Sequence, residues 1–163
     1  GNSNSTAILP AGQLGRGVEQ VVFERRDIEN ATRIEARHDG YVRPFGHAHI
    51  RALTLSADGL VLKGQDMLLP QGRAVEKGDT PFNIHFHLGP GIEIMPGDDA
   101  DSINLRLSDG SIWSFWASEG ELALDDSLFV DGEGHIHPTQ QLIISAKAGK
   151  GGRQIDWQYK FLG

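Results

Sequence analysis

The chain has 163 residues, with 15 basic side chains, 22 acidic side chains and no cysteine. This length suits one domain around one hydrophobic core, and the absence of cysteine excludes disulfides and thiol catalysis. The formal charge of −7 and the lack of a Lys/Arg-rich run argue against a nucleic-acid partner. No apolar run approaches the roughly 18 residues of a membrane-spanning helix. We therefore expect a folded module with no nucleic-acid and no membrane partner.

Residues 1–17 differ in composition from the rest of the chain. They contain Pro10, Gly12, Gly15 and Gly17, and they begin with polar residues. We expect this segment to be extended or poorly ordered and residues 18–163 to form a single domain. The first residue is Gly1 and not methionine, which is typical of a trimmed end, so we expect the chain to be part of a larger protein.

Short runs of alternating apolar and polar residues predict an all-β fold, because side chains two apart on a strand share a face. Asp58-Gly59 and Asp109-Gly110 predict tight hairpins, and residues 70–81 predict a solvated loop. In chain order, the predicted strands are Gln20–Glu24, Thr32–His38, Ala52–Ser56, Leu60–Lys63, Phe82–Leu88, Gly91–Ile94, Ile103–Leu107, Ile112–Phe115, Glu121–Asp125, Ser127–Val130, Gln140–Ala146 and Arg153–Phe161. They predict an antiparallel β-sandwich of two packed sheets, supersandwich-like, with little or no helix.

Histidines two residues apart could present two imidazoles from one strand face to a metal ion. Three such pairs occur: His47/His49, His85/His87 and His135/His137. With Glu93, the second pair resembles the metal-binding strand motif of the cupins. One hypothesis is therefore a cupin-like protein that binds a divalent metal through His85, His87 and Glu93. The alternative, which we favour, places the histidines on solvated strand faces, or packs them as satisfied polar residues at a sheet edge, with no cofactor. Metal ligands must converge, and a Gly-Pro-Gly turn precedes Glu93.

Two tryptophans flank Phe115 on one predicted strand. Trp113 and Trp116 are three residues apart, so they are expected on opposite faces. We expect core packing for at least one, while the other could stack on a sugar ring. A free-standing carbohydrate-binding module that uses Trp113 or Trp116 is therefore an alternative function. No serine elbow and no glycine-rich phosphate loop is found, so no catalytic residue is assigned.

Several stretches, taken in order, resemble the heparinase II/III-like polysaccharide lyases. They are His38-Asp39-Gly40-Tyr41, residues 51–68 (RALTLSADGLVLKGQDML), Phe86-His87-Leu88 with Pro90-Gly91, residues 105–115 (LRLSDGSIWSF), residues 138–145 (PTQQLIIS), and Ile155 with Trp157. The resemblance covers residues 18 to 161. It implies a C-terminal β-sandwich that follows an α/α-toroid domain.

The resemblance also implies an activity for the larger protein. Family members are lyases of acidic polysaccharides such as glycosaminoglycans, in which a Tyr or His base removes the uronate C5 proton before the bond at C4 is eliminated. The toroid and the family's catalytic and zinc-binding segments have no matching positions here. The resemblance therefore implies a support module that is inactive alone, whose partners are the toroid domain and, through the larger protein, an acidic polysaccharide.

Two further expectations concern location and association. The family resemblance suggests a periplasmic location for the larger protein, although the residues themselves leave the compartment unknown. A sandwich that lacks part of its sheets leaves open strand edges, and such edges promote pairing with another chain. We therefore expect a tendency to form homodimers through open sheet edges.

Overall fold

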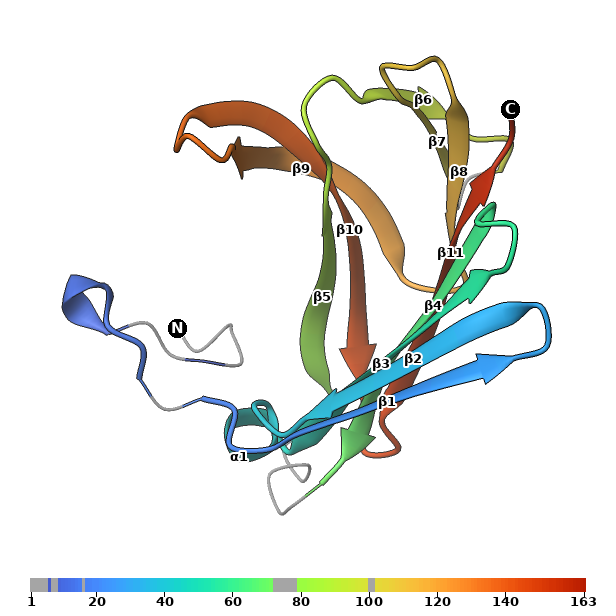
Figure 1. Cartoon of the computed structure of the whole chain (residues 1–163). Helices are drawn as coiled ribbons and strands as arrows, with labels where there is room; N and C mark the ends of the chain where they lie inside the picture. The colour runs from blue at the N-terminus through green and yellow to red at the C-terminus, as the bar shows by residue number, and fades with distance from the viewer. Residues whose placement is uncertain (1–5, 7–8, 16, 72–78, 100–101) are drawn as a thin grey trace. The chain divides into compact units, whose positions relative to one another are not determined.

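The computed structural model describes residue 6 and residues 9–15, 17–71, 79–99 and 102–163. In this part of the chain, helix is confined to a 3-10 turn, η1 (Pro10–Gly12), and one short α-helix, α1 (Val42–Phe45). Neither helix is long or apolar enough to cross a membrane. The remaining elements are β-strands (Figure 1), which confirms the all-β prediction.

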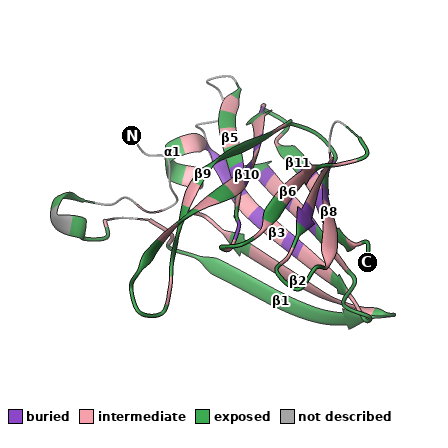
Figure 2. Cartoon of the chain, turned by 90° about the horizontal axis from the view of Figure 1, so that it is seen from above, coloured by how far each residue is buried: buried purple, intermediate pink, exposed green. Residues whose placement is uncertain are grey.

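Eleven strands follow one another along the described chain. They are β1 (Val21–Ile28), β2 (Ala31–His38), β3 (His47–Ser56), β4 (Val61–Pro70), β5 (Thr80–His87), β6 (Glu93–Pro96), β7 (Ser102–Arg106), β8 (Ile112–Ala117), β9 (Glu121–Val130), β10 (Ile136–Ala148) and β11 (Arg153–Phe161). One sheet has the strand order β1-β2-β3-β4-β11-β8-β7-β6, and a second has the order β5-β10-β9. Strand β1 ends the first sheet and is exposed along its whole length (Figure 2).

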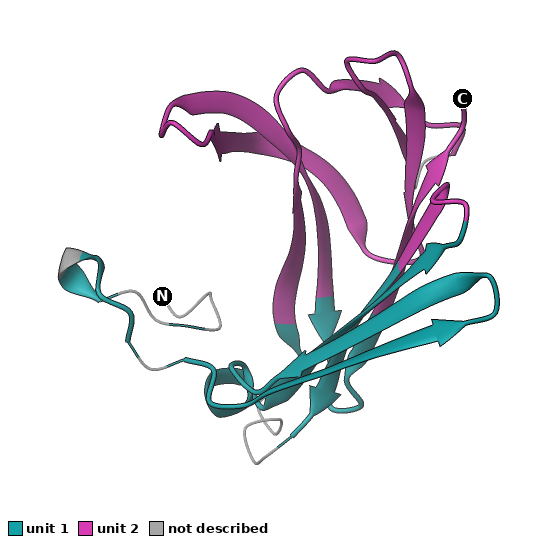
Figure 3. Cartoon of the chain, viewed as in Figure 1, with its two compact units in different colours: residues 1–57, 64–80, 147–154 teal, residues 58–63, 81–146, 155–163 magenta. Residues whose placement is uncertain are grey.

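The chain divides into two compact units that interleave along the sequence (Figure 3). Unit 1 consists of residues 1–57, 64–80 and 147–154, and unit 2 consists of residues 58–63, 81–146 and 155–163. The predicted boundary at residue 17, with a single domain after it, stays a prediction.

Unit 1 is built on a meander of β1, β2 and β3. Val21 lies opposite His38 and Ile28 opposite Ala31, so Glu29 and Asn30 form a two-residue turn. Asn30 adopts φ 56°, a left-handed conformation that asparagine tolerates better than most residues. The same antiparallel pairing continues from β2 to β3, and the alternate residues 48, 50 and 52 of β3 are buried on one face.

Unit 2 contains the contact between the two sheets. Phe86 comes from β5 in the three-stranded sheet, and its ring lies 4.9 Å from that of Phe115 and 4.8 Å from that of Trp157. Phe115 on β8 and Trp157 on β11 belong to the eight-stranded sheet and are both buried. This packing of aromatic side chains between the sheets confirms the predicted antiparallel sandwich.

Some predicted strand limits are wrong. Glu121–Asp125 and Ser127–Val130 were predicted as separate strands, but they form the single strand β9, which pairs with β10 throughout. Asp125 and Asp126 are both exposed in β9, so the two consecutive carboxylates cost little desolvation and do not interrupt it. The predicted loop 70–81 falls mostly on residues 72–78, which lie outside the described residues.

Candidate functional site

Five polar side chains of unit 1 form what we call the His–Asp cluster: His38, Tyr41, His49, Arg51 and Asp66. The β2–β3 register places His38 directly opposite His49. Arg51 lies two residues beyond His49 on β3 and so shares its face. Asp66 projects from β4, and Tyr41 lies in the turn just before α1. The cluster thus joins three strands and one turn.

Asp66 is the hub of the cluster. Its side chain is only 3% exposed. Arg51 donates from Nε to Oδ1 at 2.8 Å and from Nη2 to Oδ2 at 3.1 Å, while His49 Nε2 lies 2.7 Å from Oδ1. A buried carboxylate is tolerated only when it is paired and hydrogen-bonded. The two charge-assisted bonds from Arg51 meet that requirement.

The hydrogen bonds fix the tautomers of both histidines. The Gly40 backbone N–H donates to His38 Nδ1 at 3.2 Å, so His38 carries its proton on Nε2. That Nε2 lies 3.1 Å from His49 Nδ1 and donates to it. His49 then donates from Nε2 to the Asp66 carboxylate. A one-way chain of donors runs from Gly40 through His38 and His49 to Asp66.

Burial disfavours ionisation of His38 and of Tyr41. It lowers the pKa of His38, and the neighbouring His49 lowers that pKa further. Burial also raises the pKa of the Tyr41 hydroxyl, and Asp66 adds to that rise while Arg51 opposes it. A general base needs a pKa near the working pH and a free lone pair. All four ring nitrogens of His38 and His49 are engaged in hydrogen bonds within and beside the cluster.

His47 does not join the cluster. It is buried on β3, where its Nδ1 lies 2.9 Å from the Phe45 carbonyl oxygen and its Nε2 lies 3.4 Å from that of Gly149. His47 and His49 share a strand face, but each bonds to different groups.

The His85/His87 pair lies on β5 with stacked rings, whose centroids are 6.2 Å apart and whose planes meet at 14°. His85 Nδ1 contacts Gln141 Oε1 at 3.1 Å, and His87 Nδ1 contacts Ser127 Oγ at 2.8 Å. Glu93 lies on β6, in the other sheet, where its carboxylate pairs with Arg106. Among the residues that the structure describes, no three His, Asp or Glu side chains are arranged to hold a metal ion. Metal binding by His85, His87 and Glu93 stays a prediction, without convergent geometry to support it.

The third histidine pair meets a carboxylate that the sequence analysis did not single out. Asp131 Oδ2 lies 2.9 Å from His137 Nε2 and 3.2 Å from His135 Nδ1. The pKa of Asp131 is lowered to about 2. The hydrogen bond with His137 is the largest cause, and bonds from the backbone N–H groups of His135 and Glu133 and from the His135 side chain add to it. Asp131 therefore closes the β9–β10 turn as an anchored carboxylate.

The two tryptophans lie on opposite faces of β8. Trp113 is half-buried and packs edge-to-face on Phe161, with ring centroids 5.4 Å apart. Trp116 is 41% exposed, and its neighbours across the sheet are Ser102 and Gln158. One ring is thus a packing element and the other is open to solvent, while sugar binding by either stays a prediction.

The fold defines the chain as an antiparallel β-sandwich protein. The model of the heparinase II/III-like C-terminal family matches residues 1–158, so the chain belongs to that family. This confirms the resemblance drawn from the sequence stretches.

Solved structures show the same fold. A heparinase III, the BT4657 gene product, matches with a TM-score of 0.67 at 11% identity over 90% of this chain and 22% of its own. A heparan sulfate lyase, HepC from Pedobacter heparinus, matches with a TM-score of 0.67 at 9% identity over 85% of this chain and 21% of its own. A further heparinase III gives 0.67 at 11% identity, over 98% of this chain and 23% of its own. The chain thus spans under a quarter of these proteins' length. No curated protein matches it.

Proposed function

We propose that this chain is a non-catalytic β-sandwich module of a polysaccharide lyase that cleaves uronate-containing glycans by β-elimination. In this proposal, the base and acid come from a toroid domain of a longer polypeptide. Family membership supports the lyase context, and the similar solved structures are several times longer than this chain. The heparan sulfate lyase among them makes an acidic glycosaminoglycan the natural first substrate to test.

The closed His–Asp cluster is the observation that carries the non-catalytic role. Elimination from a uronate requires a base, an acid and a cation that neutralises the substrate carboxylate. His38 and His49 engage all their ring nitrogens within the cluster. Arg51 donates to the Asp66 carboxylate, the group that a substrate carboxylate would have to replace. Breaking these bonds would leave Asp66 buried and unpaired, which is strongly unfavourable.

Trp116 is the position where the module would contact sugar. Its exposed ring offers an apolar face, and Gln158 and Ser102 beside it offer hydrogen-bonding groups. Aromatic side chains with polar neighbours suit a sugar ring, which has apolar C–H faces and polar edges. In the proposed function, this face guides an acidic polysaccharide and takes no part in bond cleavage.

The test compares the 163-residue chain with a polypeptide in which it follows a toroid domain. Both are incubated with heparan sulfate and other uronate-containing glycans, and the unsaturated uronate product is followed by its ultraviolet absorbance. The expected result is product from the longer polypeptide alone. Product from the isolated chain that disappears in the Tyr41→Phe or His38→Gln variant would overturn the proposal and make the cluster catalytic.

A further inference from the structure

The outer edge of β1 is exposed and carries apolar side chains. Among the strands that the structure describes, β1 is terminal in its sheet, and all eight of its residues are exposed. Its apolar members include Val22 and Phe23, which are 62% and 63% exposed. Proteins usually protect an open strand edge, because its unpaired backbone groups can bind another strand. Long apolar side chains on such an edge indicate a partner.

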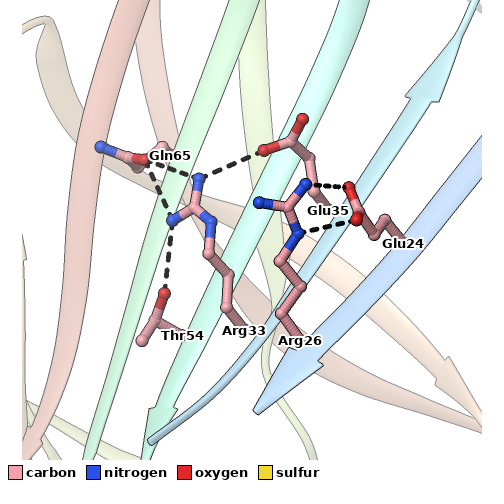
Figure 4. A network of polar contacts seen from close by, with 6 residues as sticks. All are labelled: Glu24, Arg26, Arg33, Glu35, Thr54 and Gln65. Carbon is pink, nitrogen blue, oxygen red and sulfur yellow. Dashed lines mark hydrogen bonds and ion pairs between the residues drawn. The ribbon is translucent and has the colours of Figure 1, made fainter. Parts of the chain in front are cut away.

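The side chains of β1 alternate between the two faces of the sheet. Val22, Glu24, Arg26 and Ile28 share one face, which we call the ladder face. Glu24 and Arg26 form a bidentate ion pair there, with both distances 2.7 Å. Beside them on β2, Arg33 contacts Glu35 and also reaches Thr54 and Gln65 (Figure 4). The ladder face thus presents an apolar residue at each end and one charge of each sign between them.

We infer that β1 pairs antiparallel with β1 of a second copy of this chain. A two-fold axis in such a ladder runs perpendicular to the sheet, so the ladder face of each copy stays on the same side. Each residue then lies opposite a residue of the second copy that belongs to the same face. At the two-fold axis, one residue lies opposite the same residue of the second copy. Only registers centred on a single residue are therefore allowed.

The register centred on Arg25 makes the ladder face complementary to itself. Val22 lies opposite Ile28 of the second copy, and Glu24 lies opposite Arg26 of the second copy. The two-fold axis repeats both pairs. Opposite charges and apolar pairs that face each other across strands stabilise a sheet. All four residues of the ladder face are matched in this register.

The neighbouring registers lack this match. Centring on Glu24 places that carboxylate opposite itself and Val22 opposite Arg26. Centring on Arg26 places that guanidinium opposite itself and Glu24 opposite Ile28. Like charges directly opposite one another are destabilising, and so is a charge against an apolar residue. On the ladder face, charge complementarity therefore favours the register centred on Arg25.

The other face of β1 limits the strength of the dimer. On that face Arg25 lies opposite itself and Phe23 lies opposite Asp27, although each copy offsets the Arg25 charge with the Arg25–Asp27 ion pair at 3.4 Å. Exposed ion pairs contribute little, so most of the affinity comes from the main-chain ladder and the Val22–Ile28 contacts. We therefore expect a weak dimer whose population rises with chain concentration.

A charge-swap experiment tests the pairing of Glu24 with Arg26. The Glu24→Arg variant has two arginines on the ladder face and the Arg26→Glu variant has two glutamates, so each repels its own kind. Mixed together, the two variants restore opposite charges at both positions. Analytical ultracentrifugation should find weaker association for each variant alone than for the unaltered chain, and association restored in the mixture. Far-ultraviolet circular dichroism confirms that each variant is folded. Loss of association in the mixture would overturn the register.

Disulfide formation between introduced cysteines provides a second test of the register. The chain has no cysteine, so a single introduced cysteine can pair only with its counterpart in another copy. Opposed residues in antiparallel strands have Cα atoms about 4.5–5.5 Å apart, within disulfide range. The Arg25→Cys variant should therefore oxidise to a covalent dimer. The two copies of position 27 are offset by four residues, about 13 Å, along the paired strands, so a disulfide cannot join them. The Asp27→Cys variant is therefore the matched control and should not form a covalent dimer. Cross-linking of the control and not of Arg25→Cys, or an unaltered chain that stays monomeric at every concentration, would overturn the proposal.

Discussion

His49 Nε2 and Asp66 Oδ1 lie 2.7 Å apart, although the two residues are separated by 17 positions in the chain. The bond links β3 to β4 through a carboxylate that is almost completely buried. A polar contact of this kind costs desolvation on both sides, so it is favourable only in one relative position of the strands. We infer that this contact helps to specify the register of β3 and β4.

The Asp66→Asn variant should be strongly destabilised. The substitution removes the charge that compensates Arg51 and leaves the His49 donor with a weaker acceptor. Breaking one partner of a buried pair costs about 3–5 kcal/mol, and the partial exposure of Arg51 places our expectation near the lower end, at about 3 kcal/mol. Urea unfolding followed by circular dichroism measures this loss.

The matched control is Glu29→Gln, which removes one negative charge from an exposed turn. Its unfolding midpoint should stay close to that of the unaltered chain, since isolated surface substitutions usually change stability by about 0.5 kcal/mol or less. Equal midpoints for Asp66→Asn and Glu29→Gln would show that the His–Asp cluster does not stabilise the fold.

Stability should fall when the pH drops below neutral. The pKa of His38 is lowered in the folded state by burial and by His49, so the folded chain binds its proton less readily than the unfolded chain does. The contribution is complete above the unfolded pKa of about 6.5 and is lost as the pH falls through the lower folded value. Protonation at Nδ1 would also set a new N–H against that of Gly40.

The pH dependence can be assigned with one variant. His38→Gln keeps an amide donor toward His49 but cannot titrate in this range. Urea midpoints measured from pH 8 to pH 5 should decline less steeply in His38→Gln than in the unaltered chain. Parallel declines would place the titrating group elsewhere in the chain.

The strands and tight hairpins could be predicted because their signals are local. Gly59 and Gly110 adopt φ values of 74° and 88° at the predicted Asp-Gly turns. The alternation in Arg153–Phe161 matches β11 residue for residue. The turn at Asn30 was missed because no glycine accompanies the asparagine. Local patterns therefore recover strands better than they recover less common turns.

The His–Asp cluster could not be assembled from the sequence. His38 and His49 meet only because of the β2–β3 register, and a shift of one residue would turn one of them to the other face. Asp66 did leave a signal, since it is a lone acidic residue in the strand Val61–Pro70. A charge within an apolar strand indicates a buried partner, but the identity of that partner depends on contacts between distant segments.

Phe86→Ala should destabilise the sandwich by about 2 kcal/mol, since removing this half-buried ring leaves a cavity between the sheets. The ring contacts Phe115 and Trp157 across the two sheets. The matched control is Phe23→Ala on β1, where the ring is 63% exposed and a change below about 1 kcal/mol is expected. Thermal unfolding of both variants measures the difference. A larger loss at Phe23 would contradict the assignment of the core.

Alanine substitutions of Trp113 and Trp116 should have different effects, one on stability and the other on sugar binding. Trp116→Ala removes an exposed ring and should weaken binding of heparan sulfate oligosaccharides about fivefold, which corresponds to a lost stacking contact of about 1 kcal/mol. Trp113→Ala removes the edge-to-face contact with Phe161 and should lower stability by about 1–3 kcal/mol while leaving affinity unchanged. Isothermal titration calorimetry and urea unfolding on the same two variants measure both quantities. Weaker binding in Trp113→Ala with normal binding in Trp116→Ala would move the sugar contact to the opposite face of β8.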